Sequence, residues 1–150
     1  MNRPSCMEKS TLQHLLYLAD HMRYEERAQY EKTFAKPYNA KECAMFCWKL
    51  PGPKFTVIDH VPLAAGGCAY EGAGTFELWM VGSSEGWDRK WRSLTKAARW
   101  LIDAVFEAGG RKVITHAITE RCDAIHWFER SLGMKCDNIH DGVARYVREA

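Results

Sequence analysis

The sequence has 150 residues, of which 47% are hydrophobic and 27% are charged, and its net charge is +2. A chain of this length is expected to form one domain over residues 1–150. The near-neutral charge excludes a nucleic-acid binder that is basic throughout. No apolar run approaches the roughly 20 residues of a membrane helix, and the N-terminal segment lacks the apolar core of a signal peptide.

Six cysteines are present, and without a secretory signal we expect them to be reduced thiols rather than disulfides. Cys43 and Cys47 lie four residues apart, so they share one helical face and could supply two metal ligands. No second close pair completes the four ligands of a structural zinc site. Small buried apolar residues are the favoured interpretation, and no metal is expected.

Three helices are expected in the first third of the chain. Ser10 and Gln13 have the spacing of a capping box, with Ser10 as the cap. A charged helical stretch, "HMRYEERAQYEKTF", ends at Pro37. Asn39 begins a third helix that runs to Leu50. The first helix has one apolar face formed by Leu12, Leu15, Leu16 and Ala19.

Strands alternate with helices in the rest of the chain. "KFTVID" and "PLAAGGCAY" flank a turn at residues 59–61, as in a hairpin, and "TFELWMV" is an apolar strand. A long helix is expected from Trp87 to Ala108. "RKVITHAI" is a buried strand, "CDAIHWFERSL" a helix, and the residues around Asp141-Gly142 a final hairpin. The core stripe of the long helix comprises Trp91, Leu94, Ala98, Leu101, Ile102 and Val105.

This order of elements predicts a mixed α/β (α+β) domain. The central strand–helix–strand unit requires one parallel pair of strands, whereas the hairpins on either side of it are antiparallel. We therefore expect a mostly antiparallel sheet flanked by helices.

The same order resembles the GNAT acyltransferase fold. "AIHWFERSLGM" (residues 124–134) resembles the family phrase A-I-x-W/L-Y-E-x-L-G-F, with one additional residue. "LADHMRYEERAQ" and "WRSLTKAARWLID" are similar to GNAT-like proteins encoded by podovirus-type bacteriophages. The resemblance implies that the strand before the long helix separates from the next strand. Acetyl-CoA would lie in the gap, with its pyrophosphate at the N-terminus of the long helix.

The family's phosphate-binding stretch reads Q/R-x-x-G-x-G/A. Its counterpart here is Lys90-x-x-Ser93-x-Thr95, in which both glycines are replaced. A Cβ at these two positions narrows the groove, because the pyrophosphate must approach the backbone. Cys122, near the head of the next helix, is also a candidate thiol of lowered pKa. The cofactor-binding residues expected from the resemblance are Met80, Val81, Lys90, Ser93, Thr95 and Cys122.

Two residues are candidates for the base that deprotonates an acceptor amine. Glu77 lies on the strand before the long helix, where several family members carry a carboxylate base. His116 lies near the end of the following strand, and its ordinary pKa suits a base. The alternatives are a solvent-facing glutamate and a buried structural histidine. The family's tyrosine acid is replaced by Phe128 or Glu129, depending on register, and Phe128 cannot donate a proton.

Four basic residues of the long helix recur at three- and four-residue spacing and share one face. This face is a solvated surface, a site for the CoA phosphates, or a surface for an acidic protein partner. Trp87 and Trp100 lie off the core stripe, and exposed tryptophans beside arginines are typical of interaction hot spots. The expected partner-binding residues are Arg89, Arg92, Lys96, Arg99 and Trp100.

Three functions remain open. The first is an acyltransferase that moves an acetyl group from acetyl-CoA to an amine. The second is a phage-encoded protein that acts in the cytoplasm of the infected host bacterium, where it binds a host protein such as a metabolic or signalling enzyme. The third is a structural or ejected virion protein. The interpretation that best accounts for these residues is that the chain is a phage GNAT-fold protein. It would target a host component by binding it, acylating it, or both.

Overall fold

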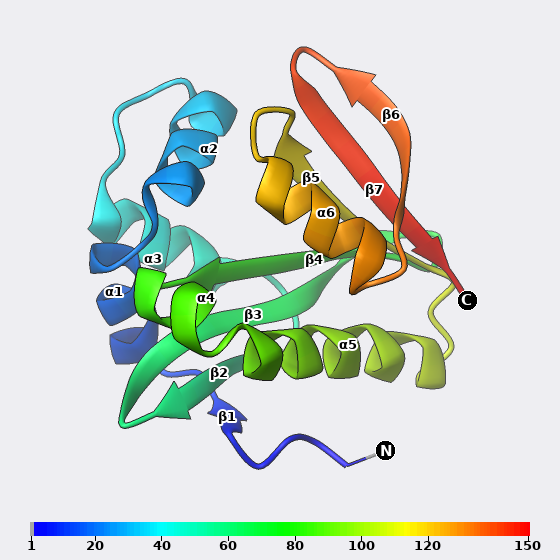
Figure 1. Ribbon diagram of the computed structural model, residues 1–150. Coiled ribbons are helices and arrows are strands. Elements are labelled where there is room, and N and C mark those ends of the chain that lie inside the picture. The colour runs from blue at the N-terminus through cyan, green and yellow to red at the C-terminus, as the bar shows by residue number, and fades with distance from the viewer. Residues whose placement is uncertain (1) are drawn as a thin grey trace.

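The computed structural model describes residues 2–150, which form one seven-stranded sheet with helices on both faces (Figure 1). The strand order is β1-β2-β3-β4-β5-β7-β6, and every neighbouring pair is antiparallel except β4 and β5. The prediction of a mixed, mostly antiparallel sheet is confirmed. The strands are β1 (Met7–Lys9), β2 (Lys54–Asp59), β3 (Val61–Gly72), β4 (Thr75–Gly82), β5 (Lys112–Ile118), β6 (Lys135–His140) and β7 (Val143–Glu149). The helices are α1 (Leu12–Asp20), α2 (Tyr24–Phe34), α3 (Ala40–Lys49), α4 (Ser84–Arg89), α5 (Trp91–Glu107) and α6 (Cys122–Arg130).

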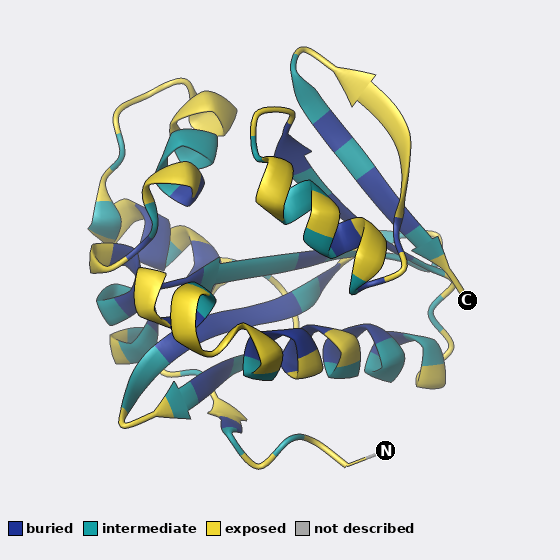
Figure 2. Cartoon of the chain, in the orientation of Figure 1, coloured by how far each residue is buried: buried dark blue, intermediate teal, exposed yellow. Residues whose placement is uncertain are grey.

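The core lies in two layers, one on each face of the sheet. Helices α1 and α3 pack on one face against Ala65, Trp79 and Val81. Helices α5 and α6 pack on the other face, where α5 buries an apolar stripe that includes Leu94 and Ile102. Each fully buried aliphatic side chain of this kind stabilises the fold by about 2 kcal/mol. The outer edge strand, β6, is exposed along its length (Figure 2).

The two predicted hairpins are confirmed. His60, between β2 and β3, has a φ of 67°. Asp141 and Gly142, between β6 and β7, have φ values of 52° and 72°, as a two-residue turn of a β-hairpin requires. Strand β1 was not predicted, because three residues are too short to show an alternating pattern.

The cap of α1 differs from the prediction by one residue. Thr11 is the N-cap: its side chain accepts a hydrogen bond from the His14 backbone N–H, and the His14 ring accepts one from the Thr11 N–H. Ser10 instead bonds the Thr56 hydroxyl at 2.8 Å and ties α1 to β2. The prediction of Ser10 as the cap is therefore wrong, because a histidine at the third helical position completes the box in place of Gln13.

The prediction of a single helix from Trp87 to Ala108 is wrong. Two helices, α4 and α5, cover this segment and meet at Lys90. The prediction that Trp91 belongs to the core stripe is also wrong. Trp91 is the first residue of α5, at the end of the stripe, and is 47% exposed beneath the Arg92 guanidinium. Conversely, Trp87 and Trp100 pack against the core. No helix among residues 2–150 is long and apolar enough to span a membrane.

Candidate functional site

Strands β4 and β5 pair only at their first three residues. Thr75–Glu77 lie opposite Lys112–Ile114, whereas β4 continues to Gly82 and β5 to Ile118. The hydroxyl of Thr115 donates a 2.9 Å hydrogen bond to the Leu78 carbonyl at the point where the strands part. Beyond that point the sheet has an opening between its two parallel strands, as the resemblance implies.

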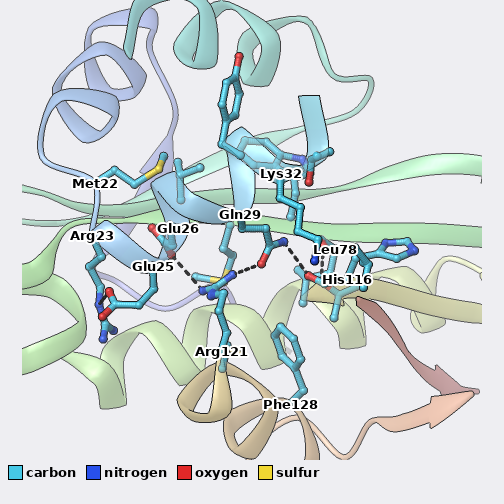
Figure 3. Close-up of a pocket in the computed structure, with 18 of the residues that line it drawn as sticks. Met22, Arg23, Glu25, Glu26, Gln29, Lys32, Leu78, His116, Arg121 and Phe128 are labelled. Carbon is cyan, nitrogen blue, oxygen red and sulfur yellow. Dashed lines mark hydrogen bonds and ion pairs between the residues drawn. The ribbon is translucent and has the colours of Figure 1, made fainter. Parts of the chain in front are cut away.

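A cavity of about 1160 Å³ spans this opening. Its walls come from α2 and α3 on one face of the sheet, from α4 and α6 on the other, and from the β6–β7 hairpin (Figure 3). One wall is aromatic, with Phe34 and Phe46 in edge-to-face contact at 5.0 Å. A ligand can therefore enter this cavity from either face of the sheet.

The two candidate bases lie side by side in this cavity. His116 Nδ1 is 3.5 Å from Glu77 Oε1, and both side chains are about one-third exposed. The pKa of His116 is raised above its ordinary value of 6.5, chiefly by the hydrogen bond to Glu77. Burial and the nearby Glu77 carboxylate raise the pKa of Glu71 on β3. The carboxylate thus orients the imidazole and stabilises it once it has accepted a proton.

Met80 and Val81, two of the predicted cofactor-binding residues, lie on β4 and line the cavity. The Leu78 carbonyl points toward β5, where Thr115 bonds it, and the Gly82 N–H farther along β4 is bonded by the Glu26 carboxylate of α2. Strand residues alternate with a period of two, so the N–H and C=O of Met80 face the same opening. They are positioned to hydrogen-bond an extended ligand.

The start of α5 departs from a phosphate-binding turn. Lys90 forms an ion pair with Asp59 at 2.9 Å, and its side chain does not cap the helix. The Thr95 hydroxyl donates to the Trp91 carbonyl and accepts from Trp127 Nε1, both at 2.8 Å. Ser93 is half-buried beside them. Of the three predicted phosphate-binding side chains, Lys90 and Thr95 are therefore engaged by the protein itself.

Helix α6 contributes aromatic residues to the groove. Trp127 packs edge-on against Trp87 at 4.9 Å, and the two rings join α4 to α6. Phe128 is buried and lines the cavity, whereas Glu129 is exposed and does not. Cys122 is exposed at the start of α6 and lines the cavity. Neither residue at the position of the family's tyrosine therefore presents an ordinary proton donor to the cavity.

The five residues predicted to bind a partner do not form one exposed surface. Arg89, Arg92 and Lys96 are exposed. Arg99 Nε donates to the Ser131 carbonyl at 2.8 Å and so ties α5 to the end of α6. The prediction that Trp100 lies off the core is wrong, because it packs edge-on against Phe55 at 5.2 Å, on β2 beneath α5.

No group of three or more His, Cys, Asp or Glu side chains within residues 2–150 is arranged to hold a metal ion. Cys43 and Cys47 are buried in the layer formed by α1 and α3, where they pack among apolar residues.

Three residues of the opening were missed by the sequence analysis: Glu26 and Gln29 of α2, and Arg121 just before α6. Glu26 is only 8% exposed, and its carboxylate accepts hydrogen bonds from the Gly82 N–H and from Trp87 Nε1, both at 3.1 Å. The only sequence signal is the three-residue spacing of Glu26 and Gln29, which places them on one face of a charged helix.

No family model matches the sequence, and no curated protein matches it. Solved structures match closely in fold. The GNAT domain of S. lividans PAT superposes with a TM-score of 0.73 at 17% identity, over 96% of this chain and 89% of that one. A GNAT-family acetyltransferase from Bacillus anthracis gives 0.72 at 12% identity, over 95% of this chain and 93% of that one.

A third match is a phosphinothricin acetyltransferase from Sinorhizobium meliloti, a GNAT-superfamily protein in complex with AcCoA. It gives a TM-score of 0.70 at 16% identity, over 95% of this chain and 86% of that one. Sequence identities this low establish the fold and not the activity. Strand order, the single parallel pair and these superpositions agree, and the chain has the fold of the GNAT acetyltransferases.

Proposed function

We propose that the protein transfers an acetyl group from acetyl-CoA to an amine. The observation that carries this proposal is the Glu77–His116 pair at 3.5 Å, placed where β4 and β5 part and facing a cavity that spans the sheet. A base at this position can serve an acceptor that enters from the α2 side while the acyl donor enters from the α5 side.

In this reaction the amine nitrogen attacks the thioester carbonyl and gives its proton to His116. The carbon–nitrogen bond forms, the carbon–sulfur bond breaks, and the thiolate leaves with the electron pair of the broken bond. Because Phe128 cannot donate a proton, the imidazolium of His116 is the group that returns the proton to the thiolate. Glu77 stabilises that imidazolium throughout.

Acetyl-CoA fits the opening in two places. The backbone of Met80 faces the gap and can pair with the amide groups of the pantetheine arm. Helix α5 begins without a side-chain cap, so its first N–H groups are available to an anion. Arg92 is exposed beside them and can contact a phosphate. Ser93 is half-buried in the first turn of α5, so added bulk there would obstruct access to these N–H groups.

Calorimetric titration with acetyl-CoA tests this proposal. We expect micromolar binding by the wild-type protein and at least a roughly tenfold loss in Ser93→Trp, since the indole obstructs the N–H groups at the start of α5. Glu107→Trp, at the exposed far end of α5, is the matched control and is expected to bind normally. If the wild-type protein does not bind millimolar acetyl-CoA, the acetyltransferase function is rejected.

We also propose a second function, namely that a phage-encoded protein of this kind binds a host protein in the cytoplasm of the infected bacterium. The observation that favours it is Trp91, which is 47% exposed beside Arg92. We expect Trp91→Ala to abolish a stoichiometric complex with a purified host protein. Trp48→Ala, which removes a 40% exposed tryptophan from α3, is expected to leave the complex intact. Equal affinity of both variants and wild type would remove this surface from consideration.

A further inference from the structure

The opening between β4 and β5 leaves backbone groups on two facing strand edges without a ladder partner. Side chains of α2 bond several of these backbone groups in place of a neighbouring strand. Gln29 Nε2 donates to the His116 carbonyl at 3.0 Å, and Gln29 Oε1 accepts from the Ile118 N–H at 3.4 Å. One amide therefore bonds β5 on either side of Ala117, much as a neighbouring strand does.

Glu26 does the same for β4. Its carboxylate accepts from the Gly82 N–H, the last residue of the strand, and from Trp87 Nε1 on α4. This arrangement requires glycine at position 82, because a Cβ there lies only 2.5 Å from Trp87 Nε1. The end of β4 is thus held to α2 through a buried carboxylate.

Arg121 connects the two halves. Its Nη1 donates to Gln29 Oε1, and its Nη2 lies 3.9 Å from Glu26 Oε1 (Figure 3). Its side chain is 17% exposed, so the network is largely shielded from water. Glu26, Gln29 and Arg121 together link the end of β4 to β5. We name these three side chains the α2 clamp.

We infer that Gln29 is a positioning residue for the proposed acetyl transfer, which fixes the His116 backbone and, through the α2 clamp, the width of the opening. The inference rests on the proposed function, since it concerns the geometry of the same base. Beyond Ile114, β5 leaves the ladder with β4, and the Thr115 hydroxyl bonds the Leu78 carbonyl directly before His116. Gln29 adds a second restraint, which acts on the peptide that carries His116.

The charged groups that face His116 make its titration a direct measure of this geometry. Glu77, 3.5 Å away, raises the pKa of His116, and Glu71 on β3 acts in the same direction. Arg145, opposite His116 on β7, acts against them. A shift of His116 away from Glu77 therefore lowers the pKa of His116 toward its ordinary value.

The test compares Gln29→Met, which keeps the length of the side chain and removes its hydrogen bonds, with the matched Gln13→Met on the exposed face of α1. Histidine ring resonances are followed by NMR as pH is varied. We expect the pKa of His116 to fall toward 6.5 in Gln29→Met and to stay raised in Gln13→Met. Gln29→Asn, which stays polar but is too short to span both contacts, is expected to behave like Gln29→Met.

In kinetic assays we expect kcat of Gln29→Met to fall roughly 10- to 100-fold, with KM for acetyl-CoA changed less than about threefold, because misplacement of a base affects the chemical step. An unchanged His116 pKa together with unchanged kcat overturns the inference. If the wild-type protein acetylates no amine, the proposed function fails, while the NMR titration still decides whether Gln29 positions His116.

Discussion

Replacement of Glu77 by Gln is expected to lower kcat/KM for acetyl transfer roughly 100- to 1,000-fold. The carboxylate is the main cause of the raised pKa of His116, so its loss removes both the orientation of the imidazole and the stabilisation of the imidazolium. An amide of the same size keeps the shape of the cavity. Steady-state kinetics with a saturating amine measures the effect.

The pH profile gives this prediction a second readout. In the wild-type protein His116 is neutral, and able to accept a proton, only above its raised pKa. In Glu77→Gln that pKa falls toward 6.5, so the acid limb of the residual activity moves to lower pH. Glu107→Gln, at the exposed end of α5, is expected to change neither rate nor profile. Unaltered rate and profile in Glu77→Gln would assign the base to another residue.

Local sequence signals were sufficient for most of the fold. The hairpin at Asp141-Gly142, the apolar run of β4 and the stripe of α5 from Leu94 to Val105 are each encoded within a few neighbouring residues, and each forms as expected. The break at Lys90 was not visible, because α4 has six residues and its composition continues the pattern of α5. Trp91 is exposed because α5 begins at this residue. A helical pattern that treats α4 and α5 as one helix cannot locate that start.

The candidate site could be predicted only in part. Glu77 and His116 were each identified from their place in a strand, but their contact depends on the parallel register of β4 and β5, which no local pattern encodes. Gln29 and Arg121 are separated by 92 positions, and only the complete fold brings them together. Glu26 resembles any solvated residue of a charged helix until Gly82 and Trp87 are placed against it.

Replacement of Glu26 by Ala is expected to lower the free energy of unfolding by about 3 kcal/mol. The change leaves the guanidinium of Arg121 buried without its carboxylate partner, and it removes the acceptor for the Gly82 N–H and Trp87 Nε1. Urea unfolding followed by far-UV circular dichroism measures the loss. Glu25→Ala, one residue away, removes an exposed carboxylate that pairs with the half-buried Arg23, and is expected to change stability by less than about 0.5 kcal/mol.

The loss should also depend on pH in a defined direction. Burial raises the pKa of Glu26 above 4.5 in the folded protein, so ionisation costs more in the folded state than in the unfolded state. The stability that Glu26 contributes is therefore fully present below its unfolded pKa and declines as pH rises through its folded pKa. We expect the difference between wild type and Glu26→Ala to be larger near pH 4 than near pH 8. The opposite trend would mean that Arg121 outweighs burial, and that the α2 clamp is held mainly by charge rather than by hydrogen bonds to the strand ends.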